Sequence, residues 1–421
     1  MATDVDVQYF SHLNGLVLGN NWGDLIRLLD KALVTGVDFT QITAASIDAQ
    51  GDVHITLYAA HKAMLFQVVE LSGFSPVSLN QKYRIKGVPS ATELILKPHT
   101  AIAETSIATM GSGKLASLGY EIIFRDTNDV KRVYRAKNPT AQHPFIRVDE
   151  SLTSPDGTSG VYASSYAKSA MVGLLENMAH IDDYENPDVR QLPFNSTNPA
   201  RNWKITGTGG SVVRGWSKWY WATSSNLNDW MNDANTPITI NRNFTLIGDK
   251  DAFYLQNSLA SNAQQKVIRG CGVFNNADSN SLNWFLATTL HTHAAQSNYM
   301  IRDSSFIGGT PFFIATAPSK ILTVSVDLLV KNHTYLNPIM PNYFSGQDSI
   351  APNSDVPALE IPIYDDAGFA RGSCKHICFA MRSRSLSSTT PIISGNSIYI
   401  ADSANYQQPT AFVYYYLGEL Q

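Results

Sequence analysis

The stretch HKAMLFQVVELSGFSPVSLNQKYRIKGVPSATELIL, residues 61–96, decides the fold class. It holds three short runs rich in β-branched and aromatic residues, namely Phe66–Leu71, Tyr83–Val88 and Thr92–Leu96. Turn-forming residues separate these runs: Gly73, Pro76, Asn80 and Pro89. Short apolar runs bounded by glycine, proline and asparagine are typical of consecutive strands joined by tight turns. The stretch therefore predicts β-strands.

The same β pattern extends in both directions from this stretch. Upstream, Val53, Ile55 and Leu57 alternate with polar residues, which predicts a half-buried strand. Downstream, residues 126–129 predict a hairpin turn. The other β-type runs are Tyr120–Asp126, Val130–Ala136, Phe145–Asp149, Trp216–Trp221, Ile238–Gly248, Ala252–Leu255, Val267–Phe274, Trp284–Leu290, Ile321–Val330, Ser373–Met381, Ile398–Ala401 and Phe412–Leu417. We therefore expect a mainly β protein of several β-sandwich-like modules.

Two segments have helical periodicity. Residues 21–35 carry one apolar stripe, with Asn21 as the expected N-terminal cap and Gly36 as the stop, and they predict an amphipathic helix. Ala167–Asn177 also places its apolar residues on one side, which predicts a second helix.

Composition shifts suggest three ranges. Residues 1–150 form an N-terminal unit, with the helix at 21–35 and small β-modules. Residues 151–200 form a helical and linker segment, because 185–202 are rich in asparagine and proline. Residues 201–421 form a large β-rich C-terminal domain.

Composition also limits the function. Only 16% of the residues are charged and the net charge is −4, which argues against binding to nucleic-acid phosphates. The densest basic region, residues 125–137, alternates with apolar residues and is interpreted as the solvent-facing side of a strand. Three cysteines make no disulfide framework, and the start MATDVDVQYF predicts no secretory signal. No apolar run is long enough for a membrane span, so we expect no membrane insertion and folding in a reducing cytoplasm.

Four motifs suggest chemistry, and each has a plainer interpretation. Residues 111–114 resemble a phosphate loop but lack its first glycine and its final Ser or Thr, so a flexible linker fits better. The His291–His293 and Cys374–Cys378 segments hold fewer ligands than a closed zinc site needs, and the cysteines are interpreted as core residues. The acidic residues 182–185 lie beside the proline-rich boundary and are interpreted as a solvated turn. We therefore predict no catalytic, cofactor-binding or metal-binding residues, and no enzyme activity.

The aromatic cluster at 216–221 is the candidate interface or ligand surface. It contains Trp216, Trp219, Tyr220 and Trp221, with Trp203 and Trp230 nearby. On a strand, Trp219 and Trp221 point to one side and Tyr220 to the other. Three interpretations stay open: buried core, an anchor for a subunit interface, and a platform for stacking sugar rings.

Several short motifs resemble those of structural proteins from the tail region of tailed bacteriophages. The 61–96 stretch resembles a small β-module repeated in that family, through His61, Val68, Val69, Gly73, Leu79, Asn80, Tyr83 and Ile85, although Lys62 stands where the family usually has glycine. Further similar segments are Leu28–Gly36, Tyr134-Arg135, Ile146–Asp149, Gly248–Leu255 and Arg371-Gly372. The matches are scattered over most of the chain.

This resemblance implies a structural component of a phage particle, in the tail or baseplate region. Its partners would be other virion proteins and copies of itself in a symmetric ring, and assembly would occur in the host cytoplasm. The alternatives are a head decoration or collar protein, or a receptor module that binds host surface glycan. The contacts would involve residues 216–221, 248–255 and 412–417, and no cofactor is expected.

Overall fold

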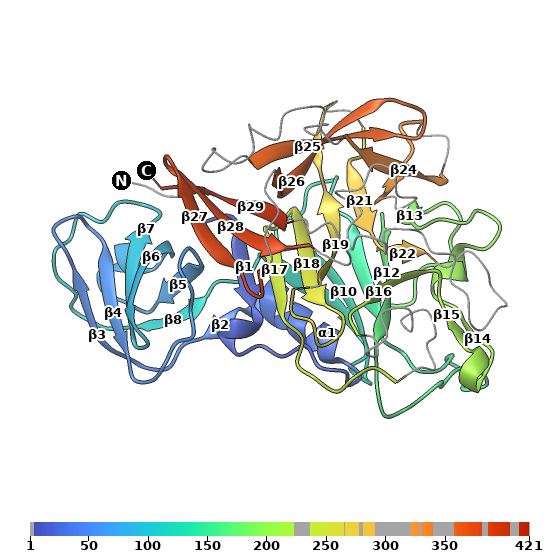
Figure 1. Ribbon diagram of the computed structural model, residues 1–421, viewed down its shortest axis with the longest axis horizontal. Helices are drawn as coiled ribbons and strands as arrows, with labels where there is room; N and C mark the ends of the chain where they lie inside the picture. Colours follow the sequence, from blue (N-terminus) through green and yellow to red (C-terminus); the bar gives the residue numbers. More distant parts are fainter. Residues whose placement is uncertain are drawn as a thin grey trace.

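The computed structural model describes residues 4–222, 236–264, 266–277, 281–290, 321–327, 331–339, 358–380, 386–404 and 412–420. The predicted mainly β fold is confirmed, because antiparallel strands form three large sheets within these residues (Figure 1). Two short strands, β14 (Ile205–Thr206) and β15 (Val213–Arg214), form a separate ribbon. His291–His293 and Trp230 lie outside the described residues.

The first sheet forms a small N-terminal module, residues 37–116, on the left of Figure 1. Its strands, in spatial order, are β2 (Val37–Asp38), β8 (Ser112–Leu115), β5 (Val68–Ser72), β6 (Lys82–Ser90), β7 (Glu93–Pro98), β4 (Val53–Leu57) and β3 (Ile42–Ile47). The alternation predicted for 53–57 is confirmed, since Val53, Ile55 and Leu57 are buried. The chain enters and leaves the module on paired strands, because Val37 lies opposite Leu115. The module is thus inserted into the main body of the fold.

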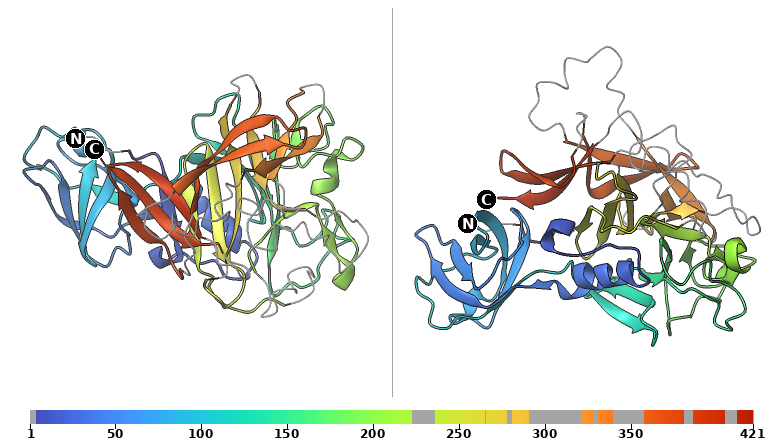
Figure 2. Two further views of the ribbon diagram at one scale, coloured as in Figure 1. Left: turned by 45° about the horizontal axis from the view of Figure 1, so that its top comes forward. Right: turned by 60° about the horizontal axis from the view of Figure 1, so that its bottom comes forward.

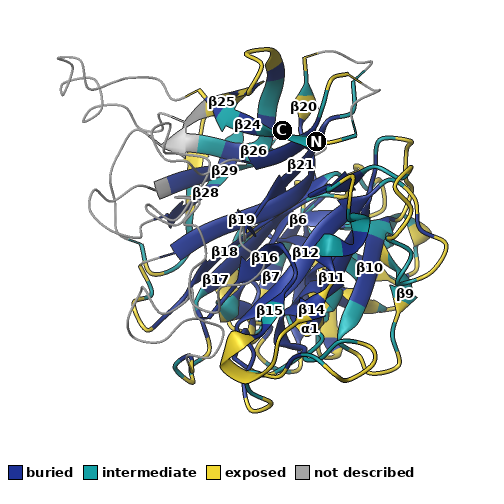
Figure 3. Cartoon of the chain, turned by 90° about the vertical axis from the view of Figure 1, so that its right-hand side faces the viewer, coloured by how far each residue is buried: buried dark blue, intermediate teal, exposed yellow. Residues whose placement is uncertain are grey.

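The main body is a sandwich whose two sheets meet at buried aromatic rings. One layer is a second seven-stranded sheet, distinct from the sheet of the module and called the seven-stranded sheet below. Its order is β22 (Thr289–Leu290), β16 (Ser217–Tyr220), β12 (Ser169–Leu175), β11 (Phe145–Asp149), β10 (Lys131–Ala136) and β9 (Tyr120–Arg125), and β13 (Gln191–Leu192) pairs with β12. The ring centroid of Phe253 lies 5.9 Å from that of Trp219 and 5.7 Å from that of Tyr120. Figure 3 shows the central strands as almost wholly buried.

The thirteen-stranded sheet forms the other layer. Its order is β1 (Gln8–Ser11), β17 (Phe244–Gly248), β18 (Ala252–Ser258), β19 (Lys266–Val273), β21 (Trp284–Ala287), β23 (Ile321–Val324), β24 (His333–Pro338), β25 (Ala358–Asp365), β26 (Ala370–Ala380), β29 (Phe412–Glu419), β28 (Ser397–Ser403) and β27 (Thr390–Ser394), and β20 (Asn275–Asn276) pairs with β26. β21 and β22 are consecutive in the chain but belong to different sheets, so the chain turns a corner of the sandwich at Thr288.

The N-terminal helical segment differs from the predicted regular helix over 21–35. It consists of α1 (Asp24–Leu29) followed by the π-helical turn η2 (Asp30–Thr35), and Gly36 ends it as expected. Asn21 is not its cap; the carboxylate of Glu150 accepts hydrogen bonds from the amides of Gly23 and Ile26 at 2.5 and 2.8 Å. The shorter helical turns are η1 (His12–Asn14), η3 (Val77–Leu79), η4 (Pro199–Asn202) and η5 (Gly209–Ser211).

The predicted helix over 167–177 is wrong, because Ser169–Leu175 form the central strand β12. All seven residues of β12 are buried, so the strand has no polar face to produce a period of two. The linker predicted at 111–114 is also wrong, because β8 pairs there with β2 and β5. A Cβ atom at position 111 would lie 2.0 Å from the carbonyl oxygen of Ser72, so glycine serves close strand packing there.

The sheets are not confined to the predicted ranges 1–150, 151–200 and 201–421. β1 of the first range pairs with β17 of the third range. β12 of the second range lies between β11 of the first range and β16 of the third range, and it pairs with both. The two chain ends also lie side by side (Figure 2), with Asp4 N donating to Glu419 O at 3.3 Å. The boundaries themselves stay a prediction.

Buried polar side chains bind the module to the main body. The fully buried Arg84 of β6 donates hydrogen bonds to the carbonyl oxygens of Asp4, Val7, Phe66 and Leu417 at 2.7–3.0 Å. The Gln8 side chain of β1 bonds to both backbone groups of Val68 in β5 and to the carbonyl oxygen of Ala116, which follows β8. These contacts connect both chain ends and the module.

Candidate functional site

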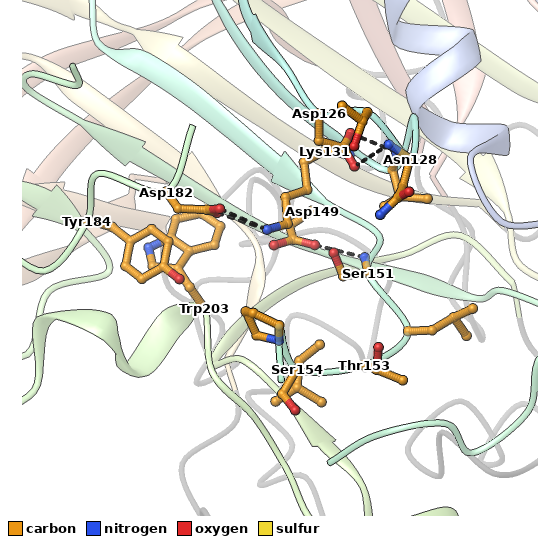
Figure 4. Close-up of a pocket in the computed structure, with 15 residues that line it drawn as sticks. Asp126, Asn128, Lys131, Asp149, Ser151, Thr153, Ser154, Asp182, Tyr184 and Trp203 are labelled. Atoms are coloured by element: carbon orange, nitrogen blue, oxygen red, sulfur yellow. Dashed lines mark hydrogen bonds and ion pairs between the residues drawn. The ribbon is translucent and has the colours of Figure 1, made fainter. Parts of the chain in front are cut away.

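A pocket of about 500 Å³ opens at one end of the seven-stranded sheet (Figure 4). Four segments form its walls: the β9–β10 turn, the loop that follows β11, residues 182–184, and the chain around η4 and β14. Its lining residues are Asp126, Thr127, Asn128, Val130, Lys131, Asp149, Ser151, Leu152, Thr153, Ser154, Pro155, Asp182, Tyr184, Trp203 and Ile205. The pocket therefore combines aromatic, hydroxyl, amide and charged groups.

A buried arginine beneath the pocket fixes both its aromatic and its acidic walls. Arg147 is fully buried on β11, and its guanidinium carbon lies 4.3 Å from the ring centroid of Trp203 and 5.0 Å from that of Tyr184. The same guanidinium donates to Asp149 at 3.0 Å and to Asp182 at 2.6 Å. Arg147 and Asp149 face the same side of the sheet because they lie two residues apart on one strand.

Lys131 closes the acidic wall from the neighbouring strand. It lies directly opposite Asp149 in the β10–β11 pair, so both side chains share one face. Its ammonium group lies 2.9 and 3.1 Å from the two carboxylate oxygens of Asp182. Burial alone would raise the pKa of Asp182, but Lys131 and Arg147 outweigh it and hold this pKa below its usual value. Asp182 therefore stays ionised at neutral pH.

The rim of the pocket is a pair of turns held by their own carboxylates. Asp126 accepts hydrogen bonds from the amides of Asn128, Val130 and Lys131, which confirms the turn predicted at 126–129. Asp149 Oδ1 accepts from the Ser151 amide at 2.8 Å and so fixes the start of the second rim loop. These contacts within the turns hold the rim in place.

The pocket can bind a polar ligand, but it has no arrangement of ligands for a metal. Across the described parts of the chain, no group of three or more His, Cys, Asp or Glu side chains could hold a metal ion. Each of the three carboxylates of the lining lies within 4 Å of a cation. Asp126 lies 3.8 Å from Arg132, and Asp149 and Asp182 both pair with Arg147. The lining thus offers fixed hydrogen-bonding groups with compensated charge.

The aromatic cluster at 216–221 is not a surface. Trp216, Trp219, Tyr220 and Trp221 are all buried, the last three at 1% exposure or less. The indole nitrogens of Trp219 and Trp221 donate to the carbonyls of Ala287 and Gly19 at 3.1 and 3.0 Å. The rings are needed to fill the sandwich between the two sheets, so the core interpretation accounts for them. The interpretations of the strand as a subunit anchor or sugar platform would need a ring of this cluster at the surface, and they stay predictions.

The 248–255 hairpin and the Cys374–Cys378 segment lie together inside the main body. Asp251 bonds to His143 at 2.8 Å and pairs with Lys375, and Asp249 lies 3.1 Å from His376. The hydrogen bond from His143 and the charge of Lys375 outweigh burial and lower the pKa of Asp251. Burial also raises the pKa of Cys378 to about 12, so this thiol stays protonated. The cluster connects strands and presents no reactive thiolate.

The acidic residues 182–185 and the basic region 125–137 were only partly understood from the sequence. Asp183 accepts the Ala179 amide in a turn, as expected, but Asp182 belongs to the pocket wall. Arg132 is not on a solvent-facing side, because its side chain is buried and pairs with Asp30 at 3.2 Å. Arg147 lies in the Ile146–Asp149 segment of the resemblance, but no sequence signal assigns a site role to it or to Tyr184, because these roles depend on contacts between distant segments.

No protein-family model matches this chain, and a search of curated proteins also finds no match. No helix among the described residues is long and apolar enough to cross a membrane.

Proposed function

We propose that this chain is a structural component of a tailed-phage particle, in the tail or baseplate region, that assembles through contacts with copies of itself and with other virion proteins. The sequence resemblance supports the phage context. The observation that carries the proposal of assembly is an exposed apolar face on β27, which is the last strand of the thirteen-stranded sheet among the described residues.

The apolar face of β27 continues a face that is buried in the next strand. Pro391 and Ile393 lie opposite Ile400 and Ile398 of β28, so the four side chains share one side of the sheet. Ile398 and Ile400 are fully buried, whereas Pro391 and Ile393 are exposed, Ile393 by 57%. A core face that ends uncovered at a sheet edge is a place where a further surface can pack.

We propose that a second copy of the chain packs against this face. A two-fold or ring contact would bury Ile393 against an apolar surface and remove it from water. Contacts through the three segments expected from the sequence stay a prediction, and none of these segments offers an edge strand. Strands β16, β18 and β29 all have a strand on each side, which leaves none of them at a sheet edge.

Charge substitution at the edge tests the assembly contact. We expect Ile393→Lys to shift the purified chain toward the monomer in mass photometry, because an ammonium group cannot be buried unpaired. Tyr58→Lys is the matched control, since Tyr58 is 78% exposed and lies in the module, whose sheet does not include β27. Equal self-association of wild type and both variants would exclude β27 as the contact.

Gold-labelled antibody on purified phage particles tests the position in the particle. Label at the distal tail is the expected result. Label on the head or neck would favour the alternative of a decoration or collar protein. Particles that lack the chain, with label in the lysate alone, would overturn the structural proposal. The receptor alternative, in the form that used the tryptophan cluster, has lost its surface because those rings are buried.

A further inference from the structure

We propose that the pocket beside Arg147 is a binding site for an uncharged saccharide. The proposal concerns the lining described above and is independent of the position of the chain in a particle. Nothing in the resemblance or in the proposed assembly contact accounts for this pocket, which lies on the seven-stranded sheet, whereas β27 belongs to the other sheet.

The charge arrangement selects a neutral ligand. A phosphate or uronic acid would need uncompensated cations, but Lys131 and Arg147 are already paired with Asp182 at 2.6–3.1 Å. A cation would need uncompensated carboxylates, but Asp149 and Asp182 share Arg147. Because the charges cancel within the wall, a positive or negative charge on the ligand adds little to the binding free energy there.

The hydrogen-bonding groups match sugar hydroxyls. Each hydroxyl can donate one hydrogen bond and accept others, so it can use both the carboxylate oxygens and the ammonium hydrogens of one wall. The wall offers both within one fixed set, from Asp149, Asp182 and Lys131, and Ser151 and Thr153 add hydroxyls on the rim. Hydrogen bonds to charged groups are also stronger than those between neutral groups.

The aromatic part of the lining supplies the apolar contact that sugar C–H faces require. Tyr184 is half-buried and Trp203 is 5% exposed, and Arg147 lies over both rings and fixes their orientation. Tyr184 therefore provides most of the accessible ring surface, with Trp203 behind it. A volume of about 500 Å³ falls in the range of small-ligand sites and suits roughly one or two sugar rings.

The test uses the full chain on an array of neutral, uronic-acid-containing and sialylated oligosaccharides, followed by calorimetric titration with the neutral glycan that binds best. We expect Tyr184→Ala and Thr153→Tyr each to weaken binding by about tenfold or more, the first through loss of the ring and the second by narrowing the pocket. Tyr58→Ala on the module is the matched control and should bind as the wild type does. Circular dichroism of each variant confirms that the fold is kept.

Salt dependence provides a second readout that a change in folding would not produce. Affinity for the neutral glycan should change little between low and high salt, because no net charge is neutralised on binding. Three results would overturn the proposal: no array glycan is bound, binding survives both pocket variants, or the bound glycans are charged and are released by salt.

Discussion

Arg84→Met is a substitution for which the structure predicts a large loss of stability. Arg84 is fully buried, and its guanidinium donates five hydrogen bonds to four main-chain carbonyl oxygens, those of Asp4, Val7, Phe66 and Leu417. These carbonyls belong to the N-terminal segment, the module and the C-terminal strand. Burial lowers the pKa of Arg84 to about 10, so the group is still protonated at neutral pH.

Methionine keeps most of the side-chain volume, so the cost comes from lost hydrogen bonds rather than from a cavity. A buried polar atom left without its partner costs about 1–3 kcal/mol. With four carbonyls affected and partial relaxation of the chain ends, we expect a loss of roughly 4 kcal/mol in the free energy of unfolding, within the range of about 3–5 kcal/mol for breaking a buried charged contact.

Urea unfolding followed by tryptophan fluorescence measures this loss. Arg125→Met is the matched control, because the Arg125 side chain is 51% exposed and its removal should change stability by less than about 0.5 kcal/mol. Hydrogen exchange should also show faster exchange in residues 4–8 and 412–420 of the Arg84 variant. If Arg84→Met unfolds within about 1 kcal/mol of the wild type and the exchange is unchanged, the assignment of Arg84 as the connection between these segments is wrong.

Three further substitutions test buried polar groups. Gln8→Leu removes the side chain that bonds to both backbone groups of Val68, and we expect a loss of about 2 kcal/mol in urea unfolding; a neutral result would contradict this pairing. Lys266→Met leaves the buried carboxylate of Asp402 without its cation and should lower the free energy of unfolding by about 3–5 kcal/mol. The double variant that also carries Asp402→Leu should recover much of this loss. If the single and the double variant lose the same stability, the ion pair is refuted. Burial raises the pKa of Glu150 to about 7, so its favourable contribution is complete below pH 4.5 and is lost as the pH rises to about 7. Relative to Glu150→Gln, the wild type should therefore lose roughly 3 kcal/mol between about pH 4.5 and pH 8, and a constant difference would refute the shift.

The parts of the fold that sequence could predict are those that face water on one side. β4 shows the alternation that its sequence predicts, because one face of the strand is buried and the other is partly exposed. The β9–β10 turn was also predictable, since Asp126 bonds to amides only two to five residues away. Local physics is sufficient in both places.

Prediction failed where both faces are buried or where the partner is distant. β12 lies between β11 and β16 with every residue buried, so its pattern cannot distinguish a strand from a helix. The cap of α1 was missed because Glu150 lies more than 100 residues from Gly23. In the pocket, the acidic residue 182 was visible in the sequence, but the role of Arg147 in holding it was not.

The same reasoning explains why the overall charge of the sequence did not indicate the buried arginines that connect its segments. A buried guanidinium carries five N–H donors, so one arginine can bond to carbonyls from several segments. Arg242 does so for Gly19, Ile238, Ile240 and Leu259, as Arg84 does for the chain ends. Each such arginine is costly to bury and is stable only when every segment around it is in place. The module and both termini are therefore expected to unfold together with the main body, which suits the proposed role as a subunit of an assembly.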